Sequence, residues 1–105
     1  MKHHFQLTYS VQPLHDDVKE KRAAEKARRL MREKLEWQPL ENIETTLVGE
    51  VYLYDSTIKE KRHEAEQKID DEIRDMLREH EVFNDIRVYL SLMVSGLGEH
   101  IEFDM

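Results

Sequence analysis

The chain has 105 residues, which suits one compact domain and is too short for two. It has no cysteine, which excludes disulfide bonds, thiolate metal sites and cysteine catalysis, and no apolar run long enough to span a membrane. Hydrophobic residues make up 39% and charged residues 37%, with a formal net charge of -7. We therefore expect a single domain over 1–105, soluble and cytoplasmic.

The first two predicted elements are a strand and a helix. Apolar and polar residues alternate over 5–11, which predicts a strand with one buried face that ends at Pro13. Asp17 and Glu20 have capping-box spacing and begin a helix that runs to about residue 35. Alanines are frequent on its apolar side, which predicts close packing against a sheet.

A second strand is predicted over 44–54, and Gly49 leaves two interpretations of it. Alternation continues through Gly49, which favours one long strand, bulged or kinked there. The other interpretation is a hairpin that turns at Gly49-Glu50. We favour the single strand, because the hairpin would leave a second arm of only about four residues.

The remaining elements complete an α+β fold. Thr57 and Glu60 form a capping box for a long helix to about Val82, followed by strands over 86–94 and 101–103. Every strand keeps a polar face, so helices should cover only one side of the sheet. This predicts a two-layer sandwich, β-α-β-α-β-β, with one four-stranded sheet and two long helices on one face. A hairpin at Gly49 would bring the order close to the ferredoxin-like arrangement.

The first helix carries a basic face in an acidic chain. Residues 18–35 hold eight basic and three acidic residues, a net charge of +5, and the rest of the chain carries -12. The basic face consists of Arg22, Lys26, Arg28, Arg29 and Arg32. These side chains suit phosphate contacts, but Glu25 and Glu33 interrupt the face and the acidic remainder repels a polyanion. A solvated face, or one that meets an acidic protein, is therefore favoured over nucleic acid, and the small apolar side argues against a membrane.

The polar side of the sheet is unusually apolar. Five residues are predicted to lie there: Val48, Tyr52, Tyr54, Tyr89 and Met93. This group suits either self-association or a stacking platform for bases, while tyrosine is also tolerated on exposed strands for its β-propensity. Few basic residues accompany it, so we expect a protein–protein surface, used in a homodimer.

Nothing in the chain has the spacing of a catalytic or metal site. The six histidines lack metal-ligand spacing, and only a site at His4 and His100, near Glu102, is conceivable if the terminal strands are neighbours. None of the four serines lies in a nucleophile motif. No helix follows Gly96-Leu97-Gly98, so we expect a turn and not a phosphate loop. We therefore expect that the protein is not an enzyme and binds no cofactor.

A general resemblance to known small proteins rests on the segments HFQLTYSV and ETTLVGEVYLY, the short length and the lack of cysteine. The whole chain resembles small uncharacterised proteins of enterobacterial genomes and prophages, without a diagnostic motif. The resemblance implies an accessory or host-modulating factor and assigns no active-site residue. Copper chaperones need a CxxC that is missing, and GEVYLY departs from the strand motif of RNA-recognition domains.

Together these patterns predict a small non-enzymatic protein-interaction module that self-associates as a homodimer and meets a further protein partner. The alternative is a nucleic-acid-associated regulator that uses the basic face of the first helix. A third hypothesis is a metal or small-molecule site at His4 and His100.

Overall fold

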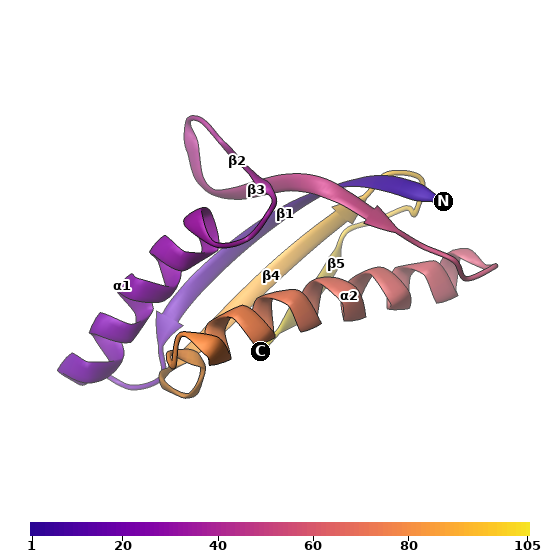
Figure 1. The fold of residues 1–105 in the computed structure, drawn as a ribbon. Coiled ribbons are helices and arrows are strands. Elements are labelled where there is room, and N and C mark those ends of the chain that lie inside the picture. Colours follow the sequence, from indigo (N-terminus) through magenta and orange to yellow (C-terminus); the bar gives the residue numbers. More distant parts are fainter.

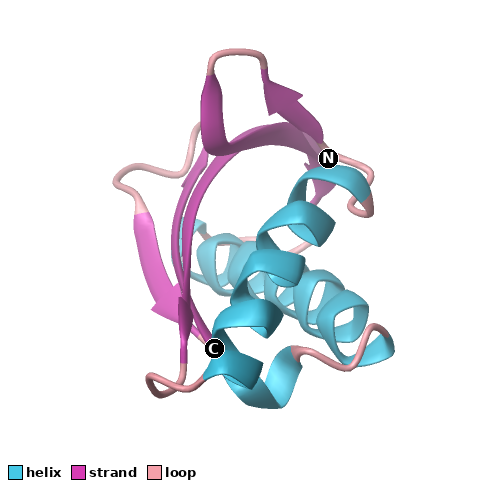
Figure 2. Cartoon of the chain, turned by 90° about the vertical axis from the view of Figure 1, so that its left-hand side faces the viewer, coloured by secondary structure: helices cyan, strands magenta, loops and turns pink.

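The computed structural model describes residues 1–105 as two helices on one face of a five-stranded antiparallel sheet (Figures 1 and 2). The elements are β1 (Lys2–Pro13), α1 (Val18–Glu33), β2 (Gln38–Leu40), β3 (Ile43–Tyr52), α2 (Ile58–Glu79), β4 (Ile86–Val94) and β5 (Ile101–Asp104), with a 3-10 turn at Phe83–Asp85. The strand order is β2-β3-β1-β4-β5, so β1 is central. The two-layer α+β class is confirmed.

The predicted count of four strands is wrong, because β2 forms a fifth. β2 has only three residues, too few to show alternation, and one of them is Pro39, a residue that is rare inside strands. Proline is tolerated here because β2 is an edge strand with a single neighbour. A tight turn at Glu41-Asn42 joins β2 to β3. The order from β1 to β4 is therefore that of the split βαβ arrangement, with β5 added at the far edge.

β3 runs through Gly49 as one strand, as the favoured interpretation predicted. Of the bulge or kink expected there, a bulge is absent from the pairing with β1, where Phe5 lies opposite Gly49 without a shift of register. Glycine is needed for another reason. A Cβ at position 49 would lie 2.8 Å from Cδ1 of Trp37 and 2.9 Å from Cζ of Phe5. These two rings pack edge to face, with centroids 5.1 Å apart, over the space that Gly49 leaves.

The core lies between the sheet and the two helices. Odd-numbered residues of β1 from Phe5 to Val11 and even-numbered residues of β4 are buried, as their alternation predicts. The alanine-rich side of α1 packs on the sheet as expected, with Ala24 and Ala27 almost fully buried. Ile58 is apolar but 60% exposed, because it is the first residue of α2.

Both helices begin at the predicted caps, and α2 ends before its predicted end near Val82. Its last residue is Glu79, and Glu81 then adopts a left-handed conformation with φ of 61°. The Glu81 amide donates to the Arg78 carbonyl and the Val82 amide to the Leu77 carbonyl, which closes the helix as a Schellman motif. This position usually holds glycine, and with glutamate there no residue type marks the end of the helix.

Candidate functional site

One face of the sheet has no helix over it (Figure 2). We call it the open face: the even-numbered residues of β1 and β3 and the odd-numbered residues of β4 that point away from the helices. Across its middle, Thr8 lies opposite Thr46 on β3 and Ser91 on β4. The centre of the open face is therefore made of small hydroxyl side chains, and its larger side chains lie towards the ends.

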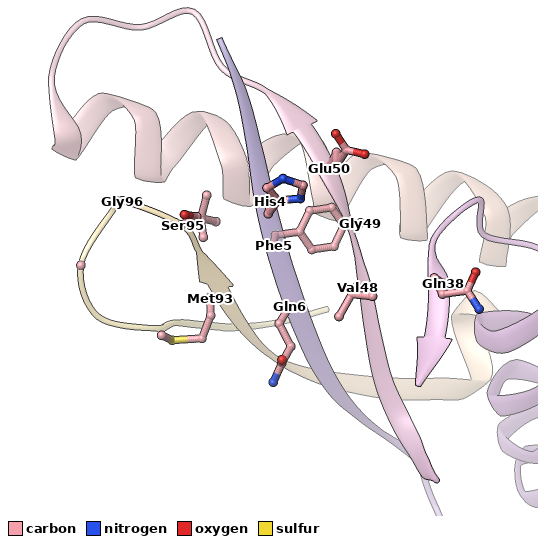
Figure 3. Close-up of a pocket in the computed structure, with 12 residues that line it drawn as sticks. His4, Phe5, Gln6, Gln38, Val48, Gly49, Glu50, Met93, Ser95 and Gly96 are labelled. Atoms are coloured by element: carbon pink, nitrogen blue, oxygen red, sulfur yellow. The ribbon is translucent and has the colours of Figure 1, made fainter. Parts of the chain in front are cut away.

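A hollow of about 650 Å³ opens on this face where β1, β3 and β4 approach the loop at 95–98 (Figure 3). We call it the sheet hollow. Val48 and Met93 lie on either side of Gln6, in register, and supply its apolar part. The polar side chains around it are those of Gln6 itself and of His4, Gln38, Glu50 and Ser95. The arrangement suits a ligand group or protein side chain that is apolar at its body and polar at its tip.

Two ion pairs lie on the open face, one between β1 and β3 and one between β4 and the neighbouring strand β5. The ammonium of Lys2 lies 2.7 Å from the Glu50 carboxylate, and the guanidinium of Arg87 lies 3.0 Å from the Asp104 carboxylate. The hydrogen bond from Lys2 lowers the pKa of Glu50, and the same bond raises the pKa of Lys2. Both groups therefore stay charged at neutral pH, and their opposite charges cancel.

The five residues predicted for this face do not all lie together in the structure. Val48 and Met93 border the sheet hollow together, and Tyr89 lies on the same face farther along β4, beside Ser10 in register. Tyr52 lies at the opposite end, opposite Lys2. Tyr54 does not belong to the open face, because the chain turns towards α2 after β3. Its ring lies beneath the Lys68 ammonium, 4.8 Å from the centroid.

The basic face of α1 is also divided, since two of its arginines are bound to the sheet. The pairing of β1 with β3 ends at Thr8, and the two strands then separate. Arg28 donates to the Val11 carbonyl at 2.8 Å and Arg32 to the Glu44 carbonyl at 2.7 Å, on the two sides of this gap. These guanidinium groups satisfy strand carbonyls, a structural role that sequence patterns do not show.

Three members of the basic face remain nearer the solvent. Lys26 donates to the His80 carbonyl at 3.2 Å, which joins α1 to the end of α2. Arg29 lies 4.0 Å from Glu33, a weak pair between exposed side chains. Arg22 has no hydrogen bond or ion pair and is exposed. A phosphate-binding surface here would therefore depend on few side chains.

The condition for a site at His4 and His100 is not met, because β4 lies between β1 and β5 and the terminal strands are not neighbours. His100 instead lies 3.6 Å from Glu102, and His4 borders the sheet hollow. No group of three potential metal-ligating side chains is arranged to hold an ion. Gly96 and Gly98 form the expected turn, with φ of 81° and 83°. Neither helix is long and apolar enough to cross a membrane.

Sequence patterns missed two polar members of the hollow, Gln6 and Gln38. Alternation assigns Gln6 to the polar side of β1, but only the strand register shows that it lies between Val48 and Met93. Gln38 was missed because β2 was not predicted. No protein-family model, curated protein or solved structure matches the chain.

Proposed function

We propose that this protein is a non-enzymatic interaction module that self-associates as a homodimer through the open face. The observation that supports this most directly is the sheet hollow on an uncovered sheet, with Val48 and Met93 at its border. Met93 and Tyr89 are 46% and 49% exposed in the single chain. Burying such side chains in a partner removes apolar surface from water, the main driving force of protein association.

Charge favours a second copy on this face. Two molecules of net charge -7 repel each other, so association is easiest where the local charge is lowest. The paired rows of the open face carry two basic and three acidic side chains, a formal charge of -1. Four of the five form the Lys2–Glu50 and Arg87–Asp104 pairs. The face can therefore approach its own copy without large electrostatic repulsion.

The test is the solution mass by light scattering, with one variant on the face and one elsewhere. We expect twice the 12.7 kDa of a single chain for the wild type, and a monomer for Met93→Glu, which places a charge beside the hollow. Ile58→Glu is the matched control, because Ile58 is also an exposed apolar residue but begins α2. A monomeric wild type, or a dimer that Met93→Glu leaves intact, would contradict the proposal.

A further inference from the structure

We propose that the two copies meet with their strands antiparallel, about a two-fold axis that crosses β4 at Ser91, so that Tyr89 of each copy enters the sheet hollow of the other. This inference rests on the proposed homodimer and adds its register. In this arrangement Tyr89 of one copy lies over Met93 of the other, and the two Ser91 side chains face each other.

The order of large and small side chains along β4 supports this register. Tyr89 and Met93 protrude from the open face, and Ser91 between them is half-buried and small. A two-fold axis at Ser91 pairs positions two residues before and after it, which brings each tyrosine to a methionine. The thioether of methionine and the aromatic ring make a favourable contact. An axis parallel to the strands would instead oppose tyrosine to tyrosine and leave both sheet hollows unfilled.

Each protruding side chain has a hollow to enter. The sheet hollow of about 650 Å³ lies on the Met93 side of Ser91. A second hollow of about 320 Å³ lies beside Tyr89, between β4 and β5, and is bordered by Glu102, Phe103 and Asp104. The antiparallel arrangement places Tyr89 at the first hollow and Met93 of the other copy near the second. Complementary packing of this kind characterises stable interfaces.

The centre and the ends of the face fit the same arrangement. Thr8 and Thr46 are joined through their hydroxyl groups at 3.3 Å, so small side chains allow the two sheets to approach to the usual distance of about 10 Å. The Arg87–Asp104 pair lies at one end of the face and the Lys2–Glu50 pair at the other. Antiparallel strands place the Arg87–Asp104 pair of one copy at the same end of the interface as the Lys2–Glu50 pair of the other. Glu102, in register with Ser91, faces its own copy across the axis and lies 3.6 Å from His100 of its own chain.

The absence of cysteine allows a direct test by cross-linking. Ser91→Cys supplies a single thiol on the proposed axis, and a bismaleimide reagent that spans roughly 10 Å should join two such chains across facing sheets. Gln12→Cys is the matched control on the same face. Gln12 lies four residues along β1 from Thr8, so the two copies of residue 12 would be about 26 Å apart. We expect a cross-linked dimer with Ser91→Cys and none with Gln12→Cys.

Affinity gives a second, independent readout. Tyr89→Ala should weaken the dimer by about tenfold or more, whereas Tyr52→Ala, at the far end of the face, should change its Kd less than about twofold. If the protein is a dimer that Met93→Glu dissociates, but Ser91→Cys is not cross-linked or Gln12→Cys is cross-linked equally, this register is wrong and the homodimer remains. A monomeric wild type would overturn both proposals.

Discussion

At position 49, glycine is required by the side chains packed against it, and not by the conformation of its own strand. Replacing glycine by alanine inside a strand ordinarily gains stability, by about 0.5–1 kcal/mol. Here the added methyl group would meet the rings of Trp37 and Phe5 at 2.8 and 2.9 Å. We expect Gly49→Ala to lower the free energy of unfolding by about 1–3 kcal/mol, because the rings are packed and cannot move aside freely.

Urea denaturation followed by tryptophan fluorescence measures this effect, since Trp37 is the only tryptophan of the chain. Gln6→Ala, on the open face of the neighbouring strand, is the control and should change stability by less than about 0.5 kcal/mol. A Gly49→Ala protein as stable as the wild type would show that the two rings have another arrangement available.

At the scale of elements, Arg62 of α2 holds the connection between β4 and β5. Its guanidinium donates to the carbonyls of Leu97 at 2.8 Å, of Glu99, and of His100 at 3.3 Å. Arg62→Ala leaves these carbonyls without their donor. We expect it to cost about 1–3 kcal/mol of unfolding free energy and to speed amide exchange at residues 97–101.

Arg22→Ala is the matched control, because Arg22 is an exposed arginine on α1 without a hydrogen bond or ion pair. It should leave both the stability and the exchange rates unchanged. If Arg62→Ala behaves in the same way, the loop is held by burial of Leu97, which is 3% exposed, and the hydrogen bonds of Arg62 contribute little.

The sequence predicts well those elements in which the alternation of apolar and polar residues extends over many positions. β1 and β4 alternate over many residues, and their buried faces follow directly. β2 has three residues and forms only because the Glu41-Asn42 turn folds it onto β3. The sheet hollow was beyond prediction because it depends on register across three strands. The positions of Arg28 and Arg32 depend on where β1 and β3 separate, which no local pattern encodes.

At the scale of the whole molecule, the distribution of charge separates the proposed function from its nucleic-acid alternative. The chain carries -7, and the +5 of residues 18–35 is its one large basic region. Arg28 and Arg32 of that region already donate to strand carbonyls, and Arg29 lies near Glu33. A polyanion would meet few free cations there and a negative field around them.

We therefore expect no binding of mixed-sequence RNA or duplex DNA tighter than about 100 μM in fluorescence anisotropy at roughly 150 mM salt. Arg29→Glu and Met93→Glu distinguish the two surfaces if binding is found, since Arg29 lies on α1 and Met93 on the open face. A micromolar Kd that weakens steeply with salt and is lost in Arg29→Glu would establish the basic face as a phosphate-binding surface. Loss in Met93→Glu instead would make the open face, or the dimer it forms, the nucleic-acid platform. Because the paired rows of the open face carry a formal charge of -1 and their two cations are already paired, neither outcome is expected from the electrostatics of this fold.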